Sequence, residues 1–224
     1  MPYRVRPMRL GDVPQVTEID REAFPTQWPP VSYKRELNNR QARYLVAYDE
    51  EPAAVEGGEC QPEGGTECAA SAPLSWFQRL RSRLKLIFSS NASSPSTSQH
   101  VAGIAGFWIL FDEAHLSTIA VRQSHRRQGI GEMLLISYIE LAAKLSAQIM
   151  SLEVRASSLG PQALYEKYGF KEIRRRRGYY TDDGEDALVM QTERITSPDF
   201  QAEFQRLKQA HAERWAVTSS QVAR

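Results

Sequence analysis

The pattern of hydrophobic and polar positions divides the chain into two regular stretches, residues 1–48 and 101–193, with an irregular stretch between them. In the first stretch, short alternating or apolar runs predict β-strands. Apolar residues three or four positions apart after a capping side chain predict helices. The predicted elements are a strand over residues 3–8, a helix capped by Asp12, a helix capped by Ser32 and a strand over residues 44–48.

The second stretch contains a longer series of elements. The apolar run Val101–Phe111 predicts a central strand, which turns and returns antiparallel as Leu116–Val121. The helix after it has a predicted apolar face made of Met133, Leu134, Tyr138, Leu141, Ala142 and Leu145. There follow a strand over residues 149–154, a helix capped by Ser157 or Ser158, and a hairpin of residues 170–180 and 187–192.

Residues 194–224 predict a helical extension at the end of the chain. Ser197 is a suitable cap, and Pro198 is well tolerated at the first helical position. The apolar stripe of this helix is Phe200, Phe204, Leu207, His211 and Trp215. We expect it to pack on the domain, or on a second copy of it, rather than to carry chemistry.

The irregular stretch, residues 49–100, has no sheet-like alternation. Its first half is rich in acids, Gly and Pro and lacks Lys and Arg, and its last part is mostly Ser, Thr, Asn and Pro. Neither part buries enough apolar surface to offset the entropy of ordering, so we predict a largely disordered insertion between two strands that pair in the core. Loop-closure entropy grows slowly with length, and the fold tolerates such an insertion.

Residues 74–88 stand apart within the insertion as a predicted basic amphipathic helix. Five apolar side chains share one face and four basic ones accompany them: Phe77, Leu80, Leu84, Ile87 and Phe88, with Arg79, Arg81, Arg83 and Lys85. Such a helix is typical of contact with a membrane surface or with the ribosome. The alternative is a helix that covers an exposed sheet edge or an apolar patch of the domain.

Composition narrows the classes of partner and cofactor. A net charge of +1 over 224 residues argues against extensive wrapping of nucleic acid, so no direct DNA contact is expected. The cysteines Cys60 and Cys68 have no further Cys or His near enough in sequence for a zinc site, and we expect no metal. Free thiols, an N-terminus without an apolar signal region and the lack of a long apolar run indicate a cytoplasmic protein.

Candidate chemistry is concentrated between Thr118 and Met133. There a strand leads through a basic, polar segment to Gly129 and Gly131 at the start of a helix. Helix N-termini expose unpaired N–H groups and carry partial positive charge, and glycines allow an anion to approach the backbone. The spacing matches neither the P-loop nor the dinucleotide fingerprint. The alternative is an ordinary strand-to-helix turn with solvated arginines.

The segment R-R-Q-G-I-G at 126–131 resembles the acetyl-CoA signature of the GNAT acetyltransferases. The segments L-E-V-R-A-S-S at 152–158, A-L-Y-E-K-Y-G-F at 163–170 and R-G-Y-Y-T-D-D-G-E-D-A at 177–187 resemble its RimI-type branch. This resemblance implies one α+β domain over residues 1–48 and 101–193, the GNAT fold. In that fold a mixed, mostly antiparallel sheet with splayed strands is flanked by helices as an α-β-α sandwich. It also implies acetylation of the N-terminal alanine of a small-subunit ribosomal protein.

The same resemblance implies roles for individual residues. Glu153 is the expected base for the amine, and Tyr165 is the expected acid for the departing coenzyme A sulfur. Ser158 stands where the branch has an Asn that contacts the cofactor, which leaves that contact open. The expected contacts with acetyl-CoA are Ile119, Ala120, Val121, Arg126, Arg127, Gln128, Gly129, Ile130, Gly131, Glu132, Ser158 and Tyr165.

Structural alternatives accompany these assignments. Glu153 is equally placed to be a carboxylate paired with Arg155 or another cation, and a Tyr at helical spacing is often a core residue. The run Arg174–Arg177 is expected to be solvated, with RNA or the cofactor's 3′-phosphate as the alternative. Acids at 182, 183 and 185 lie where the hairpin is expected to flank the peptide slot, and they suit a positively charged N-terminus.

Two other functions remain open on the sequence. One is a related enzyme that acetylates lysine side chains or small amines. The other is a non-catalytic acyl-CoA-binding protein that docks on the ribosome or a membrane through residues 74–88.

Overall fold

The computed structural model describes residues 3–26, 31–49 and 99–222, with side chains up to residue 215. Residues 50–98 of the insertion, with its predicted helix over 74–88 and both cysteines, lie outside the described residues. The described strands are β1 (Tyr3–Pro7), β2 (Ala42–Asp49), β3 (Val101–Leu110), β4 (Glu113–Val121), β5 (Ile149–Arg155), β6 (Phe170–Arg176) and β7 (Ala187–Thr192). The helices are α1 (Val13–Ala23), α2 (Tyr33–Glu36), α4 (Ile130–Lys144), α5 (Leu159–Lys167) and α6 (Pro198–Val222), with short 3-10 turns at Leu10–Asp12 and Gln123–His125.

The seven described strands form one mixed sheet in the order β1-β2-β3-β4-β5-β7-β6. Neighbouring strands pair antiparallel except β4 and β5, which are parallel. The strands on either side of the insertion, β2 and β3, pair with each other, and the Asp49 N–H donates to the His100 carbonyl at 2.9 Å. The insertion therefore leaves the sheet and returns at one point, as the sequence predicted.

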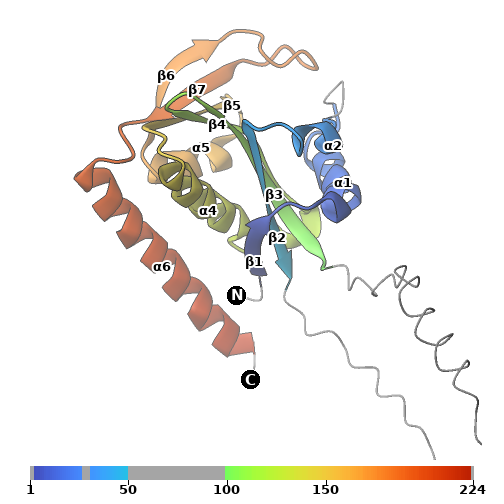
Figure 1. The fold of residues 1–224 in the computed structure, drawn as a ribbon, viewed down its shortest axis with the longest axis vertical. Helices are drawn as coiled ribbons and strands as arrows, with labels where there is room; N and C mark the ends of the chain where they lie inside the picture. The colour runs from blue at the N-terminus through green and yellow to red at the C-terminus, as the bar shows by residue number, and fades with distance from the viewer. Residues whose placement is uncertain (1–2, 27–30, 50–98, 223–224) are drawn as a thin grey trace, which may run out of the picture. The chain divides into compact units, whose positions relative to one another are not determined.

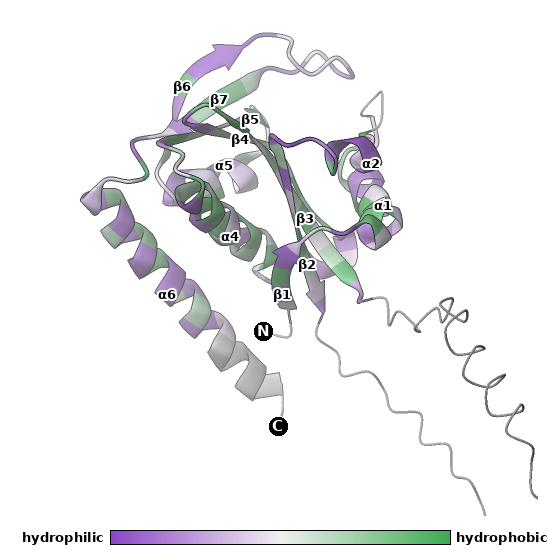
Figure 2. Ribbon diagram, in the orientation of Figure 1, coloured by the Kyte–Doolittle hydropathy of each residue, from purple (hydrophilic) through white to green (hydrophobic). Residues whose placement is uncertain are grey.

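Helices cover both faces of the sheet (Figure 1). Buried residues of α4, α5 and α6 form one apolar core, and those of α1 and α2 form a second core on the other face. The central strands and α4 are the most hydrophobic elements, whereas the edge strand β6 is hydrophilic (Figure 2). This arrangement confirms the predicted α+β class and the α-β-α sandwich.

The sheet splits between β4 and β5. Their parallel pairing runs only from Glu113, opposite Ile149, to Leu116, opposite Leu152. At this point β4 has a bulge, because Gly106 pairs with Thr118 and Phe107 with Leu116, so that Ser117 is an extra residue. A bulge bends its strand and increases the local twist. The bulge thus accounts for the divergence of β4 from β5 and for the predicted splay.

Four local predictions require correction. Asp12 precedes α1, but its side chain binds Arg6 and the Arg9 N–H instead of capping the helix, and Ser32 and Ser158 likewise make no side-chain capping bond. Leu145, predicted on the buried face of α4, is 37% exposed, because the helix ends at Lys144 and the chain turns away.

The C-terminal helix α6 lies alongside α4 on the side away from the sheet (Figure 1). Its stripe is buried as predicted, with Phe204, Leu207 and His211 each less than a tenth exposed. No helix within the described ranges is long and apolar enough to cross a membrane.

Candidate active site

The loop between β4 and α4 presents the start of a helix beside the split in the sheet. Gly129 has a left-handed backbone (φ 76°), and Arg127 has one too (φ 63°), which is uncommon for a residue with a side chain. The first intrahelical bond runs from the Met133 N–H to the Gly129 carbonyl at 2.9 Å. The amides of residues 130–132 precede that bond and lie at the positive end of α4, which suits them to an anion.

The surroundings of the two glycines in this loop differ. A Cβ at Gly131 would have only Val121 Cγ2 nearby, at 3.7 Å, so this position leaves open space beside the end of β4. A Cβ at Gly129 would instead overlap the indole of Trp215 on α6. The space beside Gly131 is suited to the predicted approach of an anion to the backbone, and at Gly129 the structure adds a second reason for glycine, the contact with Trp215.

The side chains of this loop are arranged around the same helix start. Arg126 and Arg127 are exposed, and Gln128 accepts a hydrogen bond from the Tyr3 hydroxyl at 3.1 Å. The Glu132 carboxylate receives Lys167 at 2.5 Å and the Tyr168 hydroxyl at 2.8 Å, both from the region of α5. The loop therefore carries positive charge on Arg127 and on Arg126, whose Nε donates to the Val121 carbonyl at 3.2 Å. The Glu132 carboxylate is engaged with α5, and its amide is at the start of α4.

Ile119, Ala120 and Val121 form the end of β4 beyond the bulge. On one side they pair with β3, opposite Ala105, Ile104 and Gly103. Their other edge faces the split, because the pairing with β5 has already ended at Leu116. This open edge is suited to main-chain hydrogen bonds with an extended ligand, as predicted for the pantetheine arm.

Glu153 is the first residue of β5 beyond the segment that pairs with β4. Its carboxylate is 12% exposed and lies 3.1 Å from Nε2 of His115 and 3.0 Å from the guanidinium of Arg176. The hydrogen bond from His115 lowers the pKa of Glu153, and the charge of Arg176 lowers it further. Glu153 is therefore ionised at neutral pH and paired with Arg176, which agrees with the structural alternative of a carboxylate paired with Arg155 or another cation.

A chain of polar side chains continues from Glu153 between β4 and β5. Nδ1 of His115 lies 2.9 Å from the Ser151 hydroxyl, which in turn donates to Glu113. All four side chains lie on the side of the strands opposite the buried Ala114 and Leu116, since alternate residues face opposite sides. His115 and Arg176 were missed by the sequence prediction; the polar alternation of residues 113, 115 and 117 was the available signal for His115.

Tyr165 is a buried residue of α5, 5% exposed, with its ring 5.8 Å from that of Phe170. Burial raises the pKa of the Tyr165 phenol, and the neighbouring Tyr180 raises it further. Burial also raises the pKa of Tyr180 to about 12, with a smaller contribution from Glu153. Tyr180 therefore lies near both Tyr165 and Glu153, which brings the expected acid and base to the same part of the molecule.

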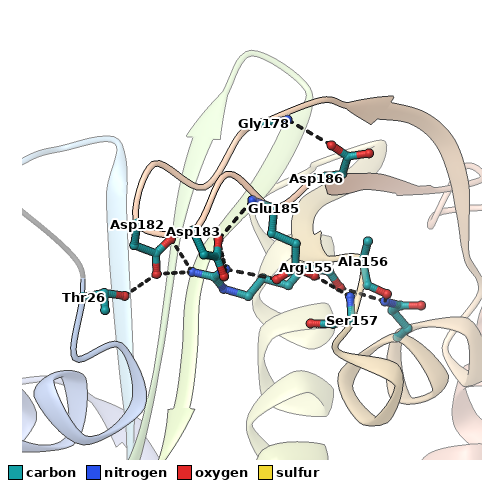
Figure 3. A network of polar contacts seen from close by, with 10 residues as sticks. Thr26, Arg155, Ala156, Ser157, Gly178, Asp182, Asp183, Glu185 and Asp186 are labelled. Carbon is teal, nitrogen blue, oxygen red and sulfur yellow. Dashed lines mark hydrogen bonds and ion pairs between the residues drawn. The ribbon is translucent and has the colours of Figure 1, made fainter.

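Arg155 holds the loop between β6 and β7 (Figure 3). Its guanidinium binds Asp182 at 2.6 Å, Asp183 at 2.8 Å and Glu185 at 3.1 Å. Asp182 also accepts a hydrogen bond from Thr26, beyond the end of α1. These acids, predicted to attract a positively charged N-terminus, are thus already neutralised in part by a cation of the chain itself.

The remaining predicted residues have the following positions. Ser158 precedes α5, and its N–H donates to the Arg155 carbonyl at 3.0 Å. Of the four arginines after Ile173, three are exposed as expected, and Arg176 turns into the site. The register of β6 against β7 shifts between Glu172 and Arg174, so that Ile173 is an extra residue in β6. Within the described residues no group of three or more His, Cys, Asp and Glu side chains is placed to hold a metal ion.

Known protein families and curated proteins include relatives of this chain. The Acetyltransferase (GNAT) family matches residues 59–170. A Bacillus subtilis protein provisionally named as a [ribosomal protein bS18]-alanine N-acetyltransferase is 33% identical over 187 residues, 83% of this chain and 92% of that protein.

Two solved structures resemble the fold. The ribosomal-protein-S18-alanine N-acetyltransferase from Escherichia coli superposes with a TM-score of 0.55 at 25% identity, over 85% of this chain and 92% of that one. A GNAT acetyltransferase from Elizabethkingia anophelis with acetyl-CoA bound has a TM-score of 0.53 at 16% identity, over 86% and 98%. The second comparison concerns the fold alone.

Proposed function

The chain belongs to the GNAT acetyltransferase family, and from this membership we infer that it acetylates the N-terminal α-amine of a protein. We take the acetyl donor to be acetyl-CoA and the acceptor to be the N-terminal alanine of a small-subunit ribosomal protein, the bS18 protein for which its relatives are named. The observation that carries this proposal is the position of Glu153, ionised and partly exposed at the point where β5 leaves β4.

The groups expected to hold acetyl-CoA are main-chain groups of β4 and of the start of α4, beside the split. The amides of residues 130–132 suit the diphosphate, and the open space beside Gly131 fits its approach. The free edge of Ile119–Val121 suits the amide-containing arm. When bound, acetyl-CoA supplies a thioester whose carbonyl carbon is open to attack by an amine.

Glu153 acts on the acceptor amine in this proposal. A protein N-terminal amine has a pKa near 7.7–8.0, so part of it is neutral at pH 7 before any catalyst acts. A carboxylate with a lowered pKa is a weak base, and a weak base suffices for an amine that loses its proton as the new bond forms. Glu153 would accept that proton directly or through one water.

Tyr165 supplies the proton for the departing sulfur. Its raised pKa keeps the phenol protonated at all pH values where the enzyme works. The ring is buried against Phe170. Ser158 remains available as a donor and acceptor at the start of α5, with shorter reach than the Asn of the RimI-type branch.

The acceptor specificity is tested by one product assay. The full chain is incubated with acetyl-CoA and peptides that begin Ala-Arg, Ser-Glu or Met-Leu, with an internal-lysine peptide and with spermidine, and the products are located by mass spectrometry. We expect acetylation at the N-terminus of the Ala-Arg peptide. Transfer only to lysine or spermidine would assign the chain to the related amine acetyltransferases. Binding of coenzyme A without transfer to any acceptor would favour a non-catalytic role.

A further inference from the structure

The C-terminal helix α6 contacts the glycine loop at one residue from two sides. Nε2 of His211 lies 3.2 Å from the carbonyl oxygen of Gly129. The indole of Trp215, one turn later, packs on the Cα of the same glycine, where a Cβ would overlap it. Residues more than 80 positions apart in sequence thus meet at the residue that precedes the first amides of α4.

The hydrogen bond between His211 and Gly129 can have only one direction. A carbonyl oxygen only accepts hydrogen bonds, so Nε2 of His211 must carry the proton and donate it. Burial lowers the pKa of His211, and the ring is therefore neutral at neutral pH even though Glu132 lies nearby. A neutral donor leaves the positive charge at this end of α4 to the amides and to Arg126 and Arg127.

Helix α6 is anchored to the domain ahead of its contact with Gly129. Phe204 and Leu207 are buried in the same core as α4 and α5. The Phe204 ring lies 6.4 Å from that of Tyr168, and Lys208 forms an ion pair with Glu140 of α4. Trp215 therefore reaches the loop from a helix that is anchored independently of the loop.

We propose that α6 is part of the acetyl-CoA site, with His211 and Trp215 as positioning residues for the diphosphate loop. The two contacts hold Gly129 in its left-handed conformation and so direct the amides of residues 130–132 toward the space beside Gly131. The proposal rests on the proposed function only in taking a coenzyme A diphosphate as the ligand. It does not depend on which amine is acetylated.

A linked equilibrium follows from this arrangement. If docking of α6 favours the loop conformation that binds coenzyme A, bound coenzyme A must favour docking of α6 by the same free energy. Helix α6 carries Arg206, Lys208 and Arg214, which are sites for trypsin. Coenzyme A should therefore slow tryptic cleavage within α6.

The test combines three variants of the full chain with the wild type. Trp215→Ala and His211→Ala remove the two contacts, and Gln205→Ala changes an exposed residue of the same helix as the matched control. Coenzyme A binding is measured by calorimetry and cleavage of α6 by limited trypsin digestion followed by mass spectrometry. We expect each contact variant to bind coenzyme A about 5- to 20-fold more weakly, with kcat at saturating acetyl-CoA within about twofold of wild type.

Folding and function are separated by further measurements. Trp215→Phe keeps an aromatic face against Gly129 and should recover most of the affinity, whereas a variant that is merely misfolded would not be rescued. Coenzyme A affinity unchanged in folded Trp215→Ala and His211→Ala, or equal cleavage of α6 with and without coenzyme A, would overturn the proposal. Wild type that binds coenzyme A but acetylates no amine would end the proposed function and leave this inference standing.

Discussion

Nε2 of His115 lies 3.1 Å from a carboxylate oxygen of Glu153, where the parallel pairing of β4 and β5 ends. This pair decides the character of the proposed base. A carboxylate in an apolar pocket has a raised pKa, but here His115 and Arg176 supply hydrogen bonding and charge that lower it. Glu153 is thus permanently ionised near neutral pH, and its fixed position contributes more than its basicity does.

Substitution of the proposed base should separate catalysis from binding. Glu153→Gln keeps the size and one acceptor atom but removes the charge, so kcat should fall about 100-fold, at the lower end of the range for a general base. The affinity for coenzyme A should not change, because the loop at Gly129 is on another element. Steady-state kinetics with the Ala-Arg peptide and calorimetry with coenzyme A measure the two quantities. Glu172→Gln, on an exposed residue of β6, is the control, and full activity in Glu153→Gln would remove the residue from the mechanism.

The dependence of activity on pH should come from the substrate and not from Glu153. Because the pKa of Glu153 is below its ordinary value of 4.5, the carboxylate is ionised throughout the range in which the enzyme is assayed. The value of kcat/KM should therefore rise with pH as the peptide amine loses its proton, with a midpoint of about 7.7–8.0. A peptide whose N-terminal amine has a lower pKa should shift the midpoint by the same amount. A midpoint that stays the same when the pKa of the peptide amine changes would contradict this assignment.

His115 should affect the stability of the chain in a pH-dependent way. Since the folded-state pKa of Glu153 is lowered, its ionisation contributes stability above about pH 4.5 that is lost as the pH falls through the lowered value. His115→Ala removes the main cause of the shift, so its destabilisation relative to wild type should be larger at pH 7 than at pH 3. His115→Gln retains a donor and should behave more like wild type. Urea unfolding at both pH values measures this, and an equal loss at both would show that His115 acts by packing alone.

Tyr165 should contribute through its hydroxyl group. Tyr165→Phe keeps the buried ring against Phe170, so the free energy of unfolding should change by less than about 1.5 kcal/mol. Without a proton for the departing sulfur, kcat should fall about 10- to 100-fold. An acyl donor with a less basic leaving thiol should recover part of the loss, which a structural defect would not allow. Tyr168→Phe, which removes a hydrogen bond to Glu132, is the matched control on the same turn of chain.

The sequence predicted the elements because each follows from local patterning. Alternation and helical spacing located the strands and most helices, and the glycines with their flanking arginines located the start of α4. What local patterning does not contain is the register between strands. The bulge at Ser117 decides where β4 and β5 separate, and with it the position of Glu153, yet Ser117 is an ordinary strand residue in the sequence.

Contacts between elements that are distant in sequence could not be predicted from single segments either. Arg176 is one of four similar arginines in the sequence, and its ion pair with Glu153 distinguishes it from the exposed ones in the structure. The sequence predicts that Gly129 allows an anion to approach the backbone, because glycine has no side chain to obstruct it. The structure gives it a second reason, the indole of Trp215, that no local pattern indicates.

The ion cluster around Arg155 makes a prediction for the acceptor side of the site. Its guanidinium holds Asp182, Asp183 and Glu185 of the β6–β7 loop, while Asp182 also reaches Thr26 beyond α1 (Figure 3). Arg155→Ala leaves three carboxylates close together without their cation, so they should repel one another and the loop should lose its fixed position. The cluster is partly exposed, so solvent screening should keep the loss of stability small.

The displaced β6–β7 loop should change the KM for the peptide and not the KM for acetyl-CoA. If the β6–β7 loop flanks the peptide, Arg155→Ala should raise KM for the Ala-Arg peptide about 5- to 10-fold, with KM for acetyl-CoA unchanged. Arg155→Lys keeps the charge but not the planar fork that binds two carboxylates at once, so it should recover only part of the effect. Lys171→Ala, which breaks the exposed pair with Glu193 on the same hairpin, is the control and should leave both constants unchanged. A rise in KM for acetyl-CoA instead would place this loop beside the cofactor and away from the acceptor.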